Sequence, residues 1–290
     1  MRTRRMKPEG EGYYHVISRI AGREYLMDAK EKDIFTGMMR RVEKFSGVDV
    51  LTFALMDNHF HILVHVPERE KVEEEVLLER YRALYGGERT ELLAAKWKSL
   101  REAGDRARVE AEQEGLRKRM CDVSEFVKTL KMRYTISYNA RKGREGTLWE
   151  GRFKSVLVEP GSPALRRVAT YIELNAVRAG IVKDPSQYRW CGCGQACRKV
   201  PEAVAGIARL VPSSADALRE YRSRFGGQAP TTAFPARVER FTKGLALGGR
   251  KYVEKVAESA GIAGGRPSFV PCPGEKCEVY ALRGPRRVTA

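Results

Sequence analysis

Long apolar segments are missing from this sequence. No run approaches the roughly 20 residues that a membrane-spanning helix needs. We therefore expect no membrane-spanning helix and no membrane partner. The basic start, Met1 to Pro8, is not followed by the apolar segment of a secretory signal. We therefore expect a cytoplasmic, nucleoid-associated protein.

Acidic residues are few relative to basic ones. The 290-residue chain contains 37 Asp and Glu against 54 Lys and Arg, which gives a formal net charge of +17. Such an excess of positive charge predicts a polyanionic partner, and nucleic acid is the leading candidate. The length is sufficient to bury a sizeable core.

Cysteine is also sparse, with six in the chain. In a reducing compartment we expect thiols rather than disulfides. Cys272 and Cys277 fit the spacing of a zinc-ligand pair loosely, so structural zinc is an alternative to ordinary thiols. The chain has no His-x-Glu motif paired with Pro-Cys-x-x-Cys, which excludes a zinc nucleobase deaminase.

Histidine occurs four times, and three of the four lie within the seven residues from His59 to His65. Side chains alternate between the faces of a strand, so we expect His59, His61 and His65 on one face and Phe60, Ile62 and Val64 in a core. A half-buried strand with a polar face is the simple interpretation. A metal site is the alternative, because neutral imidazole is a common metal ligand.

The periodicity of apolar residues predicts an α+β protein. We expect alternating strands and helices, followed by a weaker helical signal. In chain order the predicted strands are 13–20, 48–56, 59–66 and 155–158, and the predicted helices are 29–45, 124–139 and 163–177. The order β-α-β-β-α-β-α predicts a ferredoxin-like (RRM-like) antiparallel sheet with helices on one face.

Two regions fall outside this pattern. Residues 68–120 are rich in charged residues, Ala and Leu, and we interpret them as a helical insertion within a domain spanning 1–190. Residues 191–290 are expected to form a helical extension, with candidate helices at 213–225, 235–242 and 250–260. The Pro/Gly-rich chain from Arg266 onward is expected to be a flexible tail.

The segment from Arg141 to Lys154 combines basic and aromatic side chains with three glycines. Such a composition suits contacts to phosphates together with stacking on bases. An equally good interpretation is a solvated loop held to the core by Trp149 and Phe153, and the two are compatible. The candidate DNA contacts are Arg141, Lys142, Arg144, Trp149, Arg152 and Lys154.

Tyr171 and Asn175 are four residues apart in a predicted helix, so they share one helix face. If this helix crosses the strand of His59 and His61, Asn175 can offer its amide oxygen to a metal that the histidines hold. Two imidazoles and an amide oxygen suit Mg²⁺ or Mn²⁺ with phosphate oxygens as further ligands. A packed tyrosine and a helix-ending asparagine are the alternative.

Four segments of the chain stand out together. They are Tyr14-His-Val-Ile-Ser-Arg19, Met56-Asp-Asn-His-Phe-His61, Gly146-Thr-Leu-Trp-Glu-Gly-Arg-Phe-Lys-Ser155 and Tyr171-Ile-Glu-Leu-Asn-Ala-Val-Arg-Ala-Gly180. In order and spacing they resemble motifs of the single-tyrosine transposases of the HUH superfamily, especially the REP-associated tyrosine transposases of the IS200-like family. The resemblance extends roughly from Tyr13 to Trp190.

This resemblance implies roles for particular residues. His59 and His61 correspond to the metal-binding histidines, Asn175 to a polar third ligand, and Tyr171 to the nucleophile. Tyr134, on the preceding predicted helix, is the competing nucleophile.

The resemblance also implies an activity. The expected enzyme is a DNA transposase, a single-strand endonuclease and strand transferase that depends on Mg²⁺ or Mn²⁺. It would cleave and rejoin single-stranded, hairpin-flanked DNA through a 5′-phosphotyrosine intermediate, as a monomer or homodimer. The alternative is a non-catalytic DNA- or RNA-binding protein derived from a transposase.

Overall fold

A computed structural model describes residues 6–8, 10–212, 214–225, 239–262, 267–270 and 278–283. Contacts between Cα atoms divide the chain into two units. The first unit comprises residues 1–32, 50–65 and 148–290, and the second comprises residues 33–49 and 66–147.

The strands of the described residues form one sheet in the order β2-β3-β1-β4-β5-β7-β6. The order of the first four is that of a ferredoxin-like fold, which confirms the predicted class. Strands β1 and β4 are antiparallel, with His15 opposite Val156. The strands are β1 (Gly12–Arg19), β2 (Asp49–Leu55), β3 (His59–Val66), β4 (Lys154–Val158), β5 (Ala246–Gly248), β6 (Ser268–Val270) and β7 (Val279–Leu282).

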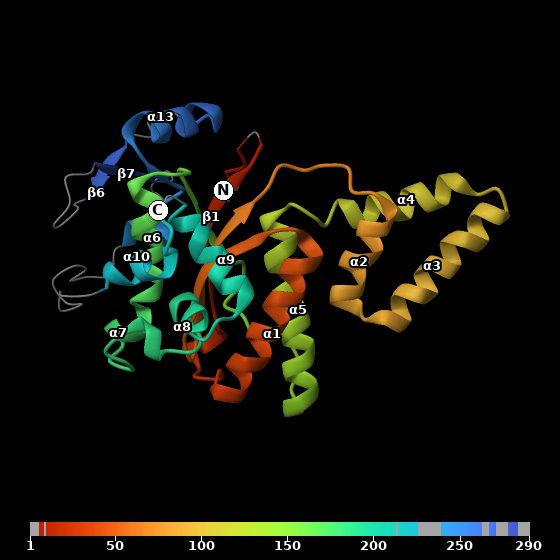
Figure 1. The fold of residues 1–290 in the computed structure, drawn as a ribbon, viewed down its shortest axis with the longest axis horizontal. Helices are drawn as coiled ribbons and strands as arrows, with labels where there is room; N and C mark the ends of the chain where they lie inside the picture. The colour runs from red at the N-terminus through yellow and green to blue at the C-terminus, as the bar shows by residue number, and fades with distance from the viewer. Residues whose placement is uncertain are drawn as a thin grey trace, which may run out of the picture. The chain divides into compact units, whose positions relative to one another are not determined.

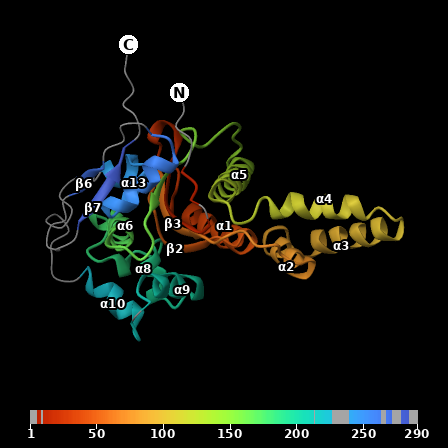
Figure 2. The same ribbon diagram turned by 90° about the horizontal axis from the view of Figure 1, so that it is seen from above.

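Helices of the first unit supply a core for one face of this sheet. Leu63 of β3 and Val156 of β4 belong to the same buried cluster as Val168 and Ile172 of α6 and Ile207 of α9. Figures 1 and 2 show α6 beside these strands. The helices of this unit are η1 (Ala21–Arg23), α6 (Pro163–Glu173), α7 (Asn175–Arg178), η2 (Pro185–Gln187), α8 (Gly192–Cys197), α9 (Pro201–Leu210), α10 (Ala217–Ser223), α12 (Glu239–Lys243) and α13 (Arg250–Ser259).

Helices make up the second unit. Helix α5 begins where the Asp122 carboxylate accepts hydrogen bonds from the amides of Ser124 (2.6 Å) and Glu125 (3.1 Å), an N-cap arrangement. The helices of the second unit are α1 (Ala29–Ser46), which starts in the first unit, α2 (Glu74–Tyr85), α3 (Gly87–Glu102), α4 (Arg106–Arg117) and α5 (Val123–Lys142). The helical character predicted for residues 68–120 is present in α2 to α4.

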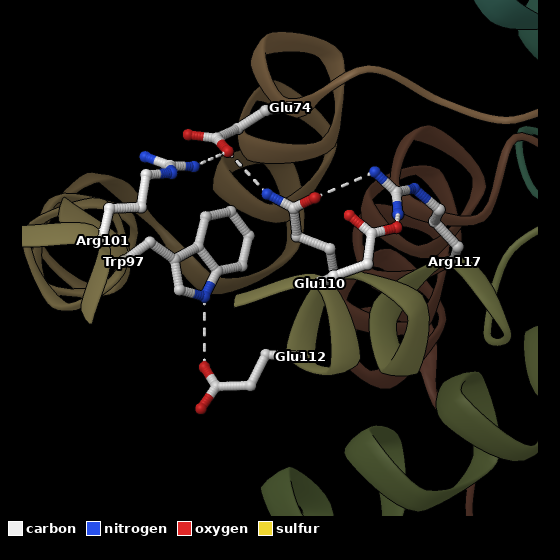
Figure 3. Close-up of polar contacts among 7 residues, drawn as sticks. Glu74, Trp97, Arg101, Glu110, Glu112 and Arg117 are labelled. Atoms are coloured by element: carbon white, nitrogen blue, oxygen red, sulfur yellow. Dashed lines mark hydrogen bonds and ion pairs between the residues drawn. The ribbon is translucent and has the colours of Figure 1, made fainter. Parts of the chain in front are cut away.

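A polar network joins α2, α3 and α4 (Figure 3). Gln113 donates to Glu74 (2.5 Å) and accepts from Arg117 (3.0 Å), and Arg101 also pairs with Glu74. The indole of Trp97, which is fully buried, donates to Glu112 (3.1 Å). The network satisfies the polar groups that these highly charged helices place against one another.

The C-terminal extension differs from its prediction. Helices α10, α12 and α13 lie within the three predicted helical stretches, but β5, β6 and β7 were not predicted. Strand β5 pairs in parallel with β4, with Leu157 opposite Ala246, and β7 pairs with both β5 and β6. The extension is therefore not purely helical, and the described part of the expected tail forms strands. Figure 2 shows α13 beside β7.

None of the described helices is both long enough and apolar enough to cross a membrane. Cys121, Cys191, Cys193 and Cys197 are free thiols. Cys272 and Cys277 lie outside the described residues, as do Ser213 and residues 235–238 of the predicted helical stretches.

Candidate active site

Strand β3 places the paired histidines as the alternation predicted. Phe60, Ile62 and Val64 are completely buried, and His61 is 4% exposed on the opposite face. The turn before the strand is closed by the Met56 amide, which donates to the His59 carbonyl (2.8 Å). The rings of His59 and His61 lie with their centroids 5.2 Å apart.

The hydrogen bonds of Asn58 define the protonation of His59. The Asn58 amide nitrogen donates to the Arg23 carbonyl (3.0 Å), so its Oδ1 is the atom that faces His59 Nδ1 at 2.7 Å. Because Oδ1 can only accept, Nδ1 of His59 is the donor, and in the neutral imidazole the lone pair is then on Nε2. A lone pair on Nε2, with Nδ1–H held by a neighbour, is the arrangement found in histidine metal ligands.

His61 has a comparable arrangement. Its Nδ1 lies 2.9 Å from Nε2 of His15, which is on the neighbouring strand β1. Burial lowers the pKa of His61 well below its ordinary value, so the ring is neutral at pH 7. Metal binding requires this neutral form. His59 and His61 thus fit a divalent cation.

Helix α6 carries Tyr171 to these histidines. The helix begins at Pro163 after Ser162, whose hydroxyl accepts from the Leu165 amide (3.3 Å). The Tyr171 ring lies edge-on to His61, with centroids 5.8 Å apart, and 6.1 Å from the ring of His15. The structure therefore brings together the tyrosine and the two histidines that the sequence singled out.

Asn175 stands at the start of α7, one turn after Tyr171. Its amide nitrogen donates to the carbonyl oxygens of Tyr171 (3.1 Å) and Ile172 (3.0 Å). The amide group is thereby oriented, with its Oδ1 left as the acceptor end. The break between the two helices at Leu174 divides the single helix that was predicted.

Arg178 contacts Tyr171 and was not among the site residues predicted from the sequence. Its guanidinium carbon lies 4.2 Å from the Tyr171 ring centroid, and Nη2 donates to the Tyr171 carbonyl (2.8 Å). Nη1 is buried and has no hydrogen-bond partner among the described residues. The spacing of seven residues, two helical turns, was the available signal. A guanidinium that keeps one donor available beside a tyrosine suits an incoming phosphate.

Phe241 also reaches this site, from α12. Its ring centroid lies 5.3 Å from that of Tyr171, and its carbonyl oxygen lies 2.8 Å from Nδ1 of His15. Together with Arg178 it covers the tyrosine, which is 4% exposed. Nothing in the local sequence distinguishes Phe241, because its role comes from a contact 226 residues distant in the chain.

The competing tyrosine has a different environment. Tyr134 is completely buried in the second unit. Its ring packs against those of Phe35 (5.1 Å) and Tyr138 (5.9 Å). Tyr134 therefore belongs to a core of aromatic side chains.

The predicted DNA contacts divide between the units. Arg141, Lys142 and Arg144 are exposed in the second unit, and Arg152 and Lys154 are exposed in the first. Trp149 does not fit its predicted role as a DNA contact, because it is 4% exposed and packs edge-on against Phe60, with ring centroids 5.5 Å apart. It anchors the loop, as the alternative interpretation held, and does not present a face for base stacking.

Among the residues that the structure describes, no three His, Cys, Asp or Glu side chains are grouped so that they could hold a metal ion. A metal site built on His59 and His61 would therefore need a third ligand from another kind of side chain. The amide oxygen of Asn175 is the ligand that the sequence predicted.

The sheet order and the paired histidines beside a tyrosine define a class: ferredoxin-like proteins with a His-hydrophobe-His strand and a tyrosine on a crossing helix. Residues 10–78 match the family model described as IS200-like transposase. This span includes His15, His59 and His61, and Tyr171 lies beyond it. The match confirms, for this span, the predicted resemblance to the IS200-like transposases, which act on DNA.

Comparison with solved structures gives weaker similarity. A REP-associated tyrosine transposase bound to a REP hairpin is 14% identical, with a TM-score of 0.41, covering 70% of this chain and 90% of that one. A candidate transposase from Deinococcus radiodurans is 15% identical, with a TM-score of 0.27, covering 60% and 96%. No curated protein matches the chain significantly in sequence.

Proposed function

We propose that this protein cleaves and rejoins single-stranded, hairpin-flanked, REP-like DNA through a 5′-phosphotyrosine intermediate, with Tyr171 as the nucleophile. The observation that carries the proposal is the position of the Tyr171 ring, 5.8 Å from that of His61. The family match of residues 10–78 supports a DNA substrate, as does the net charge of +17.

His59 and His61 would hold the divalent cation, Mg²⁺ or Mn²⁺, through their Nε2 atoms, with Asn175 Oδ1 as third ligand. When bound, such a cation polarises the scissile phosphate and offsets its charge. His61 is neutral, because burial lowers its pKa, and it holds its proton on Nδ1, so binding of a cation needs no proton release from this ring.

In the proposed cleavage step, the phenol oxygen of Tyr171 attacks the phosphorus. The new bond joins the tyrosine to the 5′ side of the DNA, and the bond from phosphorus to the 3′ oxygen breaks. The phenolic proton leaves to solvent and the departing 3′ oxygen takes one up. Rejoining is the reverse attack by a 3′-hydroxyl, which releases the tyrosine.

Arg178 is suited to two tasks in this step. Its charge lies over the Tyr171 ring, where it can offset negative charge that develops at the phosphate during the attack. Its buried Nη1, without a partner among the described residues, can donate to a phosphate oxygen. Because Tyr171 is only 4% exposed, the attack requires a rearrangement that brings its hydroxyl into contact with DNA.

The competing proposal is a non-catalytic DNA- or RNA-binding protein derived from a transposase. The observation that favours it is the 4% exposure of Tyr171. Under this alternative, the exposed side chains of Arg141, Lys142, Arg144, Arg152 and Lys154 serve binding alone.

A covalent-adduct assay separates these proposals. The protein is incubated with Mn²⁺ or Mg²⁺ and a labelled library of hairpin-forming single strands with randomised flanks, and denaturing gels reveal adducts. We expect adducts with wild type and with the matched control Tyr134→Phe, but none with Tyr171→Phe or in the presence of a chelator. An adduct that persists in Tyr171→Phe overturns the nucleophile assignment. No adduct with wild type across the library supports the binding-only alternative.

A further inference from the structure

We propose that His15 is a positioning residue that fixes the tautomer of His61 and so leaves the His61 Nε2 atom for a divalent cation. The hydrogen-bonded chain runs from the Phe241 carbonyl through His15 to His61. The role in metal binding rests on the metal site of the proposed function, whereas the tautomer does not.

The chain of hydrogen bonds begins at an atom that can only accept. The carbonyl oxygen of Phe241 lies 2.8 Å from Nδ1 of His15, so Nδ1 of His15 carries the proton. His15 is completely buried, and its two hydrogen-bond partners are a backbone carbonyl and an imidazole, neither of which offers a negative charge. A buried cation without a negatively charged partner is strongly disfavoured, so the His15 ring is neutral and its Nε2 is an acceptor.

The second step transfers this constraint to His61. Nε2 of His15 lies 2.9 Å from Nδ1 of His61, and two acceptors would repel each other at this distance. His61 must therefore donate from Nδ1, which places its lone pair on Nε2. The two rings are inclined by 28°, with centroids 5.1 Å apart.

His65, four residues after His61, has the opposite arrangement. The Arg209 guanidinium, which can only donate, lies 2.8 Å from His65 Nδ1. The carboxylate of Glu11 lies 2.8 Å from Nε2, so His65 holds its proton on Nε2. Both ring nitrogens are engaged, which explains why His65 is not available as a ligand. It also provides an internal reference with the other tautomer.

This chain of hydrogen bonds joins residues that are far apart in the sequence. His15 lies on β1, next to β3 in the sheet, and the accepting carbonyl belongs to α12 in the C-terminal extension. We infer that the extension contributes to the site through this backbone atom. The family match ends at residue 78, so this contact is outside the matched region.

Imidazole nitrogens report their protonation directly in two-bond ¹H–¹⁵N spectra. We would record these for the metal-free full chain with ¹⁵N-labelled histidine at pH 7. We expect the Nδ1–H form for His15 and His61 and the Nε2–H form for His65. Wild-type His61 found in the Nε2–H form overturns the proposal.

Variants test what the contact does for the cation. His15→Leu removes both hydrogen bonds, and we expect His61 to move towards the Nε2–H form, with Mn²⁺ affinity reduced about 10- to 100-fold. His15→Gln keeps one donor and one acceptor and should restore the wild-type tautomer and most of the affinity. His65→Leu is the control and should leave Mn²⁺ binding unchanged. Affinity is measured by titration with Mn²⁺ followed by electron paramagnetic resonance.

The two levels of the proposal fail differently. An unchanged His61 tautomer and unchanged Mn²⁺ affinity in His15→Leu overturn the role of His15. A wild-type protein with the Nδ1–H tautomer that does not bind Mn²⁺ supports the hydrogen-bonded chain but overturns the metal site of the proposed function. If His15→Leu fails to fold, the wild-type spectrum and His15→Gln still decide.

Discussion

At the scale of single residues, the carboxyl group of Glu173, in the last turn of α6, opposes folding because it is completely buried. Its Oε1 accepts hydrogen bonds from Thr52, from the Cys193 amide (2.9 Å) and from Tyr221 (3.3 Å). Its Oε2 has no hydrogen-bond partner among the described residues. Burial outweighs these hydrogen bonds and raises the pKa of Glu173 to about 7.

This raised pKa predicts the pH dependence of folding. The folded state holds the Glu173 proton up to about pH 7, and the unfolded state releases it near 4.5. Stability therefore falls as pH rises through this window. The rise in pKa from 4.5 to about 7 corresponds to about 3 kcal/mol. Glu173→Gln cannot ionise, so the difference in unfolding free energy between variant and wild type should grow by this amount between pH 4.5 and 8.

Chemical denaturation at several pH values measures that difference. Other titrating groups are common to both proteins and cancel, including His15, whose lowered pKa acts in the opposite direction. A difference that stays constant with pH would show that Glu173 is ionised in the folded protein.

Residue-level prediction from sequence succeeded where a local rule applies. The alternation of β3 placed His61 opposite Phe60. The helical repeat predicted a shared face for Tyr171 and Asn175, and their approach to the histidines depended on the helix crossing β3. His15, Arg178 and Phe241 were not assigned site roles, because their contacts depend on which strands are neighbours and on where the extension folds back. Trp149 was assigned from composition, and composition does not say whether an aromatic ring faces a ligand or the core.

At the scale of elements, β2 is the edge of the sheet, and the chain after α7 covers it. The Leu55 amide donates to the Trp190 carbonyl (3.0 Å), and Ala54 forms a bridge with Cys191. Helix α9 approaches the same strand through Gly206. A Cβ atom on Gly206 would lie 2.6 Å from the carbonyl oxygens of both Val50 and Leu51. Covering the edge in this way blocks pairing with other strands.

Two helix-interior glycines should therefore respond in opposite ways to alanine. Gly206→Ala in α9 should destabilise the fold by about 1–3 kcal/mol, because backbone atoms must move. Gly115→Ala in α4 meets no atom within 4 Å and should stabilise by up to about 1 kcal/mol, since alanine favours the helix. Denaturant unfolding of both variants measures these changes. Stabilisation by both would mean that α9 does not pack closely on β2.

The length of each helix or strand decided whether it could be predicted from the sequence. The strands β1 to β4 and the helices α1, α5 and α6 are long enough to show a period of two or 3.6 residues. Strands β5 and β6 have three residues each and β7 has four. Such segments carry too little periodicity to be recognised, and their place in the sheet depends on pairing with β4 rather than on their own sequence.

At the scale of the whole molecule, the net charge of +17 should make binding to single-stranded DNA strongly dependent on salt. Each phosphate contact contributes about 0.7 to the slope of log affinity against log salt concentration. Replacing two of the proposed contact residues, Arg141 and Lys142, by alanine should thus lower the slope by about 1.4. Fluorescence anisotropy with a labelled single strand across a salt series measures it.

A charge-matched control distinguishes local contacts from the overall field. Lys98→Ala with Arg108→Ala removes the same charge from α3 and α4, where both side chains pair with glutamates, and should leave the slope nearly unchanged. Tyr171→Phe should keep the full slope while losing the adduct, because binding and bond breaking use different groups. Equal loss of slope in both double variants would mean that net charge alone governs binding, and would remove Arg141 and Lys142 from the DNA contacts.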